Sequence, residues 1–501
     1  MTSPDSATLL SIDAGTTSTR ALVFDLAGGI RGQGQKELTQ FFPAPGWVEH
    51  DASEIWARTA DVVRTALEMA GQMPAAIGIT NQRETCLLWD ADSGMPLAPA
   101  IVWQDRRTTD LCRRLRQEGL ESEVRARTGL LLDPYFSATK LAWLLDNTDG
   151  ARALAARGRL RAGTIDSWLV WRLTGGRVHA TDATNASRTM LFNIHDGGWD
   201  PWLLDLFGVP ADILPEVRDC AGHFGVTDPT LFGAEIPITG IAGDQQAATV
   251  GQACFAPGMI KATYGTGAFL LLNTGGNAVT SDGGLLATIA YQVDGQPVYA
   301  IEGSIFSAGS AVQWLRDALG LIRSAAETEA YAAGLPHNKG VYLVPAFTGL
   351  GAPHWDPEAR GLITGIGRDT GPPELARAAL ESVAYQTRDL LEAMFAALGE
   401  AAPSTRERVL RADGGMTANR WLMQFLTDMV DMPVDVAVVT ETTALGAAYL
   451  AGLGAGLLPD LDAIAARWQV AQRYRPRMDG AERDALYAGW QQALNRTLWS
   501  A

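Results

Sequence analysis

The sequence predicts an α/β protein built from two related halves. Along its 501 residues, short apolar runs typical of strands alternate with longer segments whose apolar residues recur at helical spacing. A strand–turn–strand hairpin occurs twice, at residues 9–25 and 261–273, and both turns are rich in Gly and Thr. No low-complexity linker interrupts the chain. We therefore expect one domain around each hairpin, residues 1–253 and 254–501, called here the first and the second half.

Both hairpin turns have the composition of phosphate-binding turns. In the first, LLSIDAGTTSTRALVFD, residues 15–18 leave N–H groups and hydroxyls pointing outward, and convergent N–H groups form a site for anions. Asp13 ends the first strand, where its carboxylate could hold a Mg²⁺ ion that bridges phosphates. A tight hairpin with a solvated Asp is the simpler interpretation. The second turn, at residues 264–267, favours phosphate binding, because its repetition suggests two related halves that close on one nucleotide.

Composition and charge exclude several classes of protein. The net charge of −16 would repel the phosphate backbone of a nucleic acid, so we expect no nucleic-acid partner. No apolar run approaches the ~18 residues of a membrane-spanning helix, and the first residues lack the basic and apolar regions of a signal peptide. The four cysteines lie far apart and make no metal-binding spacing. We expect a cytoplasmic protein with reduced cysteines, in which any metal ion is bound by carboxylate and phosphate oxygens.

In the first half, the expected strands lead into polar residues or helices. Asp51 and Glu54 have the spacing of a capping box and open a helix with apolar residues on one face. Arg83 and Glu84 follow an apolar strand at 76–80; they are either a surface ion pair or part of the crevice that strand ends line in α/β sheets. Asp244 opens an Ala-rich helix, either as its N-cap or as a general base displayed between the halves. Other expected segments are strands at 100–103 and 163–166, a helix within 135–147 and a polar loop at 183–190.

The second half continues the alternation. A helix is expected beyond Ser307, and a Pro-Pro pair at 372–373 begins a long helix for which Gly399 is the C-cap signal. The glycine turn DGGMTAN, residues 413–419, joins a strand to another helix. Two phosphate turns, this glycine turn and acidic residues at strand ends together indicate ATP held between the halves. The remaining expected segments are strands at 341–347 and 409–412, a last strand at 434–439, and an Ala- and Gly-rich helix at 443–453 that permits close packing.

Nine stretches spread over essentially the whole chain are typical of one enzyme family. No Walker sequence GxxxxGK[ST] and no protein-kinase motif occurs beside them. The stretches are PGWVEHD from Pro45, GITNQRET from Gly78, AIVWQ from Ala100, DPYFSATK from Asp133, TNASRTMLFNIH from Thr184, IAGDQQAA from Ile241, YGTG from Tyr264, VPAFTGLGAP from Val344 and TALGAAYLAGL from Thr443.

These stretches, with signature patterns at 135–147 and 361–381, resemble the FGGY family of carbohydrate kinases and, within it, the glycerol kinases. The resemblance implies two ribonuclease-H-like domains of the actin, hexokinase and heat-shock-70 superfamily, with an active-site cleft between them. It also implies ATP-dependent phosphorylation of glycerol to sn-glycerol 3-phosphate, with ATP and Mg²⁺ as cofactors. The chain would be a homo-oligomer, a dimer or a tetramer, as is common in the family.

The resemblance also implies roles for individual residues. Asp244 would be the base that takes the proton of the attacking hydroxyl, and Asp13 with Asp244 would face the metal. A triol offers little apolar area, so polar contacts to its hydroxyls must carry its recognition. The residues implied for glycerol are Arg83, Glu84, Tyr135, Asp244 and Gln245, with Trp103 and Phe269 as an aromatic wall. Those implied for the nucleotide are Thr16, Thr17, Ser18, Arg20 and Thr266 at the phosphates, and Gly309, Gln313, Gly415 and Asn419 around the nucleoside.

Some positions depart from the glycerol kinase pattern. Ala14 stands where glycerol kinases usually carry Gln. Thr230 and Glu235 occupy the places of a phosphorylatable His and of an Arg that binds fructose 1,6-bisphosphate in some members, so we expect neither form of control. One alternative is a sibling FGGY kinase acting on a pentulose or other polyol. Another is a nucleotide-switched chaperone or filament protein, which would not need the substrate-side residues.

Overall fold

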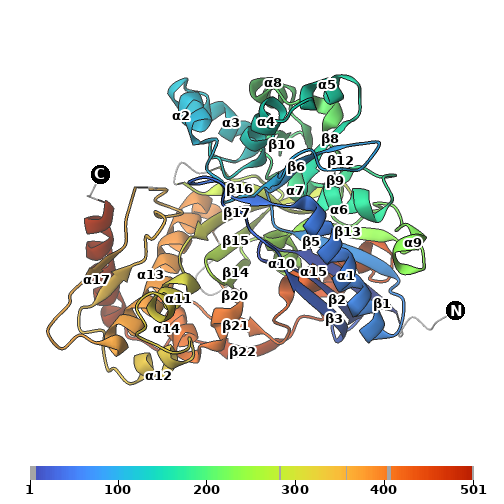
Figure 1. Cartoon of the computed structure of the whole chain (residues 1–501). Helices are drawn as coiled ribbons and strands as arrows, with labels where there is room; N and C mark the ends of the chain where they lie inside the picture. The colour runs from blue at the N-terminus through green and yellow to red at the C-terminus, as the bar shows by residue number, and fades with distance from the viewer. Residues whose placement is uncertain (1–6, 281–283, 357, 403–407, 499–501) are drawn as a thin grey trace.

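Two mixed β-sheets flanked by helices form the core of the protein (Figure 1). The computed structural model describes residues 7–280, 284–356, 358–402 and 408–498. Strands and helices alternate as the sequence predicts, so the α/β class is confirmed. Within these ranges, none of the helices combines the length and the apolar composition needed to cross a bilayer.

The first sheet has the strand order β13-β5-β1-β2-β3. β1, β2 and β3 form an antiparallel meander, whereas β5 and β13 run parallel to β1. The central strands are buried because structure covers both of their faces. The strands are β1 (Thr8–Ala14), β2 (Ser18–Asp25), β3 (Ile30–Glu37), β5 (Ala76–Asn81) and β13 (Ile238–Gly243).

The second sheet repeats this unit. Its order is β16-β17-β15-β14-β20-β21-β22, in which β17-β15-β14-β20-β21 has the same succession of antiparallel and parallel pairs as β3-β2-β1-β5-β13. This repetition is what a hairpin used twice predicts. The strands are β14 (Ile260–Tyr264), β15 (Ala268–Gly275), β16 (Leu286–Val293), β17 (Gln296–Ile305), β20 (Leu410–Asp413), β21 (Val434–Ala437) and β22 (Val470–Tyr474).

Two helices join the halves at the centre of the molecule. α10 (Asp244–Gly251) follows β13, and α15 (Thr442–Gly454) follows β21 and packs on both α10 and the first sheet. A Cβ atom at Gly446 would lie 1.8 Å from the carbonyl oxygen of Ala247, and one at Gly251 would lie 2.0 Å from that of Thr442. The close packing expected of the Ala- and Gly-rich helix is therefore confirmed.

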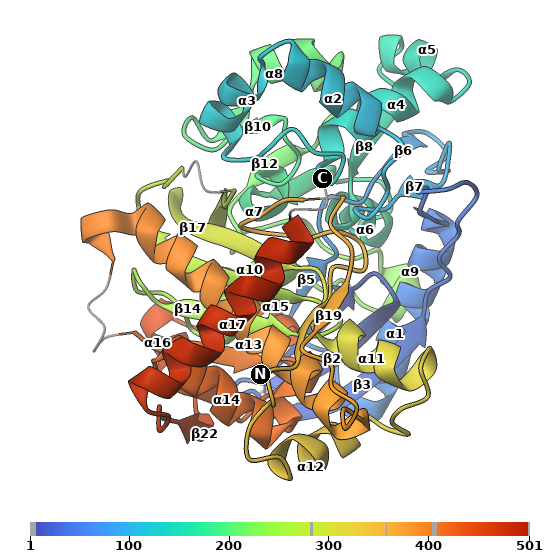
Figure 2. The ribbon, with the colours of Figure 1, turned by 90° about the vertical axis from the view of Figure 1, so that its left-hand side faces the viewer.

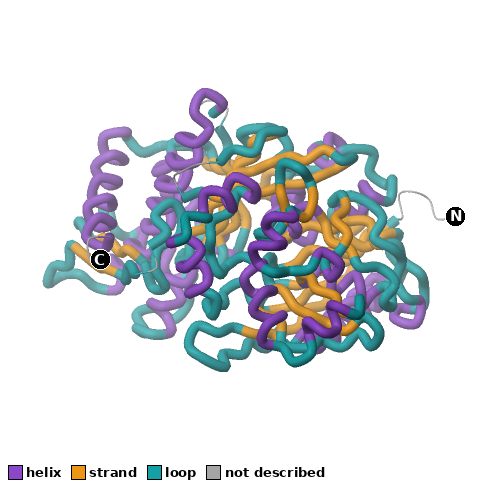
Figure 3. Tube along the Cα trace, turned by 90° about the horizontal axis from the view of Figure 1, so that it is seen from above, coloured by secondary structure: helices purple, strands orange, loops and turns teal. Residues whose placement is uncertain are grey.

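Helices cover the outer faces of both sheets. In Figure 1, α2 to α5 and α8 form a group above the first sheet, whereas α11 to α14 and α17 lie beside the second. Figure 2 shows α17 in front of α13, and Figure 3 shows the strands running through the interior. The helices are α1 (Ala52–Ala70), α2 (Thr109–Gln117), α3 (Glu121–Thr128), α4 (Ser137–Asn147), α5 (Ala151–Ala156), α6 (Ile165–Leu173), α7 (Ala183–Ala186), α8 (Pro201–Phe207), α9 (Pro229–Phe232), α11 (Gly309–Asp317), α12 (Glu327–Ala333), α13 (Pro372–Leu398), α14 (Arg420–Val430), α16 (Leu461–Ala465) and α17 (Gly480–Leu498).

Shorter strands complete the fold. A four-stranded sheet has the order β4-β7-β6-β8, and the other strands pair two by two. They are β4 (Glu49–His50), β6 (Cys86–Asp90), β7 (Ala100–Ile101), β8 (Leu160–Thr164), β9 (Ala180–Asp182), β10 (Phe192–Asn193), β11 (Gly198–Trp199), β12 (Glu216–Arg218), β18 (Tyr342–Val344) and β19 (Leu362–Thr364).

The structure corrects several local predictions, among them the strand expected at 163–166, where β8 ends at Thr164 and α6 begins at Ile165. The expected polar loop at 183–190 begins with helix α7, because Asp182 accepts hydrogen bonds from the N–H groups of Thr184 and Asn185 and caps it. The strand expected at 100–103 is only two residues long. The strand at 434–439 is not the last, because β22 follows it. β22 reads VAQRY, and it escapes the apolar signal because an edge strand exposes much of its surface.

Candidate active site between the two hairpins

The two predicted phosphate turns are both formed. In the first, the N–H of Gly15 donates to the carbonyl of Ser18 at 3.0 Å; in the second, Gly265 donates to Gly267 at 2.9 Å. Thr17 and Thr266, at the tips of the turns, are exposed. Each turn therefore presents hydroxyl and backbone groups to solvent, as binding of phosphate oxygens requires.

The predicted nucleoside residues gather around the second turn. The N–H of Gly309 donates to the carbonyl of Gly265 at 3.0 Å, and a Cβ atom at Gly309 would lie 2.6 Å from the same oxygen. Gly414 has a φ of +92°, and a Cβ atom there would lie 2.4 Å from the carbonyl oxygen of Tyr264. The start of α11 and the glycine turn thus both rest on this hairpin. The other predicted residues of this group are Gly415, Asn419, which caps α14, and Gln313, which is exposed on α11.

Asp13 and Arg20 face each other across the first hairpin, where they are register partners in β1 and β2. Arg20 Nη2 lies 2.5 Å from Asp13 Oδ2, and Arg20 Nη1 lies 2.5 Å from Glu441 Oε2, directly before α15. Burial raises the pKa of Asp13, the Arg20 charge opposes this, and the nearby Asp244 carboxylate raises it again. Two carboxylates close enough to repel each other are suited to share a hard cation with phosphate oxygens.

Arg83 and Glu84 are buried, so the interpretation as a surface pair is wrong. Arg83 makes two bonds to Glu302, Nη1 at 2.5 Å and Nη2 at 3.0 Å, and its Nη1 also donates to Gln246 at 3.3 Å. Burial lowers the pKa of Arg83, but the carboxylates of Glu302 and Glu84 raise it by more, so it stands well above its usual value. The Arg83 guanidinium is thus permanently charged, and Glu302 and Gln246 fix its two Nη atoms.

Arg188 completes a cluster of buried charges that the sequence did not predict. Its Nε donates to Glu84 at 2.6 Å and its Nη2 to Glu302 at 3.1 Å, and its guanidinium carbon lies 5.6 Å from the centre of the Tyr135 ring. Burial raises the pKa of Glu84, and the charges of Arg188 and Arg83 offset only part of this increase. The available signal was the carboxylate of Glu302 inside the mostly apolar stretch YAIEGSIF, because a buried charge needs a buried partner.

Asp244 is the accessible carboxylate of this site. It is the first residue of α10, whose N-cap is Gly243, so the N-cap interpretation is wrong in detail. Its Oδ1 accepts from the N–H of Gln245 at 2.7 Å and lies 3.1 Å from Arg83 Nε. The side chain is 33% exposed, compared with 1% for that of Glu302. Of the Glu84, Glu302 and Asp244 side chains, that of Asp244 is therefore the most exposed.

Gln245 and Trp103 are each fixed by one hydrogen bond. Lys261 Nζ, from β14, donates to Gln245 Oε1 at 2.5 Å, which leaves the Gln245 NH₂ group as the donor available elsewhere. Trp103 Nε1 donates to the hydroxyl of Thr16 in the first phosphate turn at 3.0 Å, and its ring meets that of Tyr135 edge-on at 5.5 Å. Phe269 lies partly exposed on β15, so it belongs to the same side as the second hairpin.

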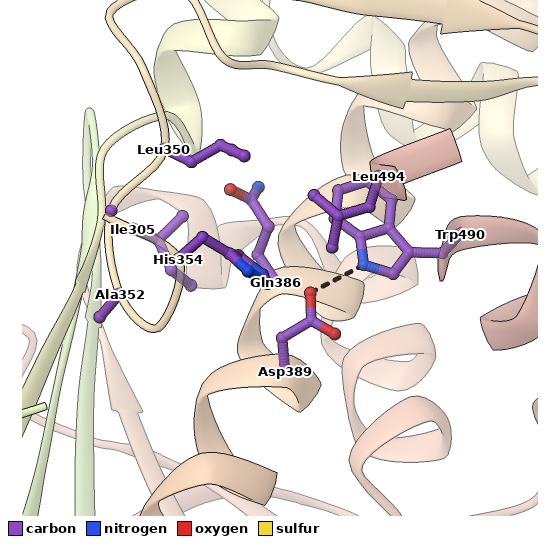
Figure 4. Close-up of a pocket in the computed structure, with 9 residues that line it drawn as sticks. Ile305, Leu350, Ala352, His354, Gln386, Asp389, Trp490 and Leu494 are labelled. Carbon is purple, nitrogen blue, oxygen red and sulfur yellow. Dashed lines mark hydrogen bonds between the residues drawn. The ribbon is translucent and has the colours of Figure 1, made fainter. Parts of the chain in front are cut away.

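A separate cavity lies in the second half, lined by residues of α13, α17 and the 350–354 loop (Figure 4). Its free volume of about 10 Å³ is the space of roughly one water molecule. Asp389 borders it and accepts hydrogen bonds from Trp490 at 2.8 Å and Tyr487 at 2.5 Å. None of the predicted site residues lines this cavity, so we assign it to packing.

Comparison with known proteins gives matches over both halves. Two family models match, the FGGY family of carbohydrate kinases, N-terminal domain, at residues 8–251, and the C-terminal domain at residues 260–455. A glycerol kinase of Alcanivorax borkumensis is 60% identical over 97% of this chain and 98% of its own length. Glycerol kinase 1 of Pseudomonas aeruginosa is 59% identical with the same coverage. A crystal structure of Plasmodium falciparum glycerol kinase with ADP is 36% identical, with a TM-score of 0.92 over 98% of both chains.

Proposed function

We propose a function from the premise that the chain belongs to the FGGY family of carbohydrate kinases, as the family models over residues 8–251 and 260–455 establish. The chain phosphorylates glycerol with ATP, giving sn-glycerol 3-phosphate. The observation that carries this conclusion is the identity of 58–60%, over nearly the whole chain, to proteins named glycerol kinase. The arrangement of a polar cluster and aromatic side chains beside the phosphate turns is consistent with this reaction.

Glycerol would bind where the polar cluster meets the aromatic side chains. Arg83 and the Gln245 amide group supply donors, and Glu84 and Asp244 supply acceptors, which suits hydroxyl groups that both donate and accept. Trp103 and Phe269 would flank the carbon chain, and Tyr135 lies edge-on to Trp103. The small size of a three-carbon triol matches a set of polar groups that are already held close to one another.

ATP would bind with its phosphates between the two turns. Thr16, Thr17, Ser18 and Arg20 would contact them from the first half and Thr266 from the second. The nucleoside would lie against the second half, beside the residues gathered at its hairpin. This proposal is supported by the hydrogen bond that fixes the start of α11 to that hairpin and by the close approach of Gly414 to the backbone of Tyr264. The nucleoside residues are Gly309, Gln313, Gly415 and Asn419.

Asp244 would take the proton from the attacking hydroxyl of glycerol. Its support is its exposure, its place at the first residue of α10, where the helix dipole favours a negative charge, and its distance from Arg83. Asp13, with Asp244, would hold Mg²⁺, and the ion when bound would neutralise charge on the phosphates. Arg20, fixed between Asp13 and Glu441, would orient the transferred group.

We also propose the domain boundary between residues 253 and 254, which falls in the segment between α10 and β14. Cytoplasmic location fits four buried, unpaired cysteines. A dimeric or tetrameric state is proposed from the family resemblance.

A panel of acceptors tests the proposal. The purified protein is assayed for ATP-dependent ADP release with glycerol, xylulose, ribulose and gluconate. We expect kcat/KM to be at least tenfold higher for glycerol, because a misplaced hydroxyl leaves a buried polar group unpaired at a cost of about 1–3 kcal/mol. A pentulose that equals glycerol would assign the chain to a sibling kinase instead.

A further inference from the structure

Glu302 connects the second half to the substrate side of the first. It lies on β17 between Ile301 and Gly303, and side chains alternate between the two faces of a strand. A Cβ atom at Gly303 would point to Leu390 of α13, on the outer face of the sheet. Glu302 therefore points the other way, toward the first half, although it is separated from Arg83 by 219 residues of sequence.

The Glu302 carboxylate binds two guanidinium groups at once. Its Oε2 lies 2.5 Å from Arg83 Nη1, while its Oε1 accepts from Arg83 Nη2 at 3.0 Å and from Arg188 Nη2 at 3.1 Å. Burial raises the pKa of Glu302, but the charges of Arg188 and Arg83 lower it by more, so the group is ionised. Removing its charge would leave the two buried cations with only Glu84, which pairs with Arg188, and the partly solvated Asp244, which lies 3.1 Å from Arg83 Nε.

This carboxylate also limits how each arginine can turn. Arg83 has five N–H donors, and Glu302 and Gln246 already use three of them, while its Nε faces Asp244. One Nη2 hydrogen remains for another partner. Arg188, held by Glu302 at Nη2, uses its Nε to hold Glu84 at 2.6 Å. The orientation of Arg83 and that of Glu84 thus both depend on Glu302.

We propose that Glu302 is a positioning residue for the glycerol site: from the second half, it holds Arg83 directly and Glu84 through Arg188. The inference rests on the proposed function, since it is the glycerol contacts of Arg83 and Glu84 that Glu302 would orient. In the part of the chain that the structure describes, the Glu302 carboxylate bonds to Arg83 and Arg188 and to no residue of either phosphate turn. Its loss should therefore affect glycerol and leave ATP binding nearly unchanged.

The test compares Glu302→Gln with Glu381→Gln. Glu381 is a matched control, because it is equally buried in the second half and pairs with Arg377 at 2.6 Å, but contacts no residue of the site.

In Glu302→Gln, one carboxylate oxygen becomes an NH₂ group that meets a guanidinium donor. We expect the KM for glycerol to rise about 10- to 100-fold, the loss for a charged hydrogen bond. The KM for ATP should change less than twofold. Glu381→Gln should lower the melting temperature with both KM values unchanged.

Glu302→Asp keeps the charge but shortens the reach, so it cannot bridge both arginines as before. It serves as the second variant if Glu302→Gln does not fold, and we expect an intermediate rise in the glycerol KM. An unchanged glycerol KM in the folded variant, or an equal rise for ATP and glycerol, would overturn the inference. If the wild-type enzyme prefers another polyol, the proposed function is refuted but the inference about Glu302 is not. The Glu302 variants would then be compared by their KM for that polyol.

Discussion

The role of Asp244 can be separated from its structural contribution by replacing it with Asn. Asn keeps an oxygen that can accept from the Gln245 N–H, a bond of 2.7 Å in the native protein. What is lost is the charge 3.1 Å from Arg83 Nε, and Arg83 retains both of its bonds to Glu302. Because Asp244 is 33% exposed, solvent screens this ion pair, and we expect a stability loss of at most about 1 kcal/mol.

The effect on turnover should be far larger. A base that accepts the proton of the attacking hydroxyl contributes roughly 10²–10⁴-fold, or about 3–5 kcal/mol in the barrier. We therefore expect Asp244→Asn to fold and to bind ATP, with kcat reduced by that factor. The assay measures ADP release at saturating substrates, together with urea unfolding.

Asp51→Asn is the matched control, because Asp51 accepts from the Ser53 N–H at 2.7 Å at the start of α1, away from the site. A folded Asp244→Asn enzyme with near-normal turnover would refute the assignment.

Three further changes test the surroundings of the site. Trp103→Phe keeps an aromatic ring but removes the N–H that donates to Thr16 in the first phosphate turn. We expect kcat/KM for glycerol to fall about fivefold, which corresponds to the loss of one neutral hydrogen bond. An unchanged kcat/KM would contradict this. Lys261→Met keeps the length of the side chain but leaves Gln245 Oε1 without its donor, so the glycerol KM should rise about tenfold; a stability loss without a change in KM would show that Lys261 is only structural. Burial, with the charge of Asp182, raises the pKa of Asp166 to about 7, so between about pH 4 and pH 7 the folded state keeps a proton that the unfolded state has lost. As the pH rises through this range, the free energy of unfolding should therefore fall by up to about 4 kcal/mol more in the native protein than in Asp166→Asn. Equal pH slopes of the two proteins in urea titrations would exclude this.

The hairpins were predictable because their information is local. A turn such as residues 15–18 is set by its own small residues and by the apolar strands on either side. The α/β alternation and the start of α10 at Asp244 are local in the same sense. The edge strand β22 was missed because its residues face solvent and lack the alternation that a half-buried strand needs. The roles of individual site residues stay predictions.

The charges that hold the site together could not be predicted from local sequence. Glu302 reaches Arg83 across 219 residues, and Lys261 reaches Gln245 from a strand that starts beyond the end of α10. A single carboxylate in an apolar strand indicates only that some buried partner must exist, since an unpaired charge would cost too much to bury. Which partner it is depends on how the two sheets face each other. Because Glu302 on β17 and Lys261 on β14 of the second half bind Arg83 and Gln245 of the first, the residues proposed to bind glycerol are held by both halves.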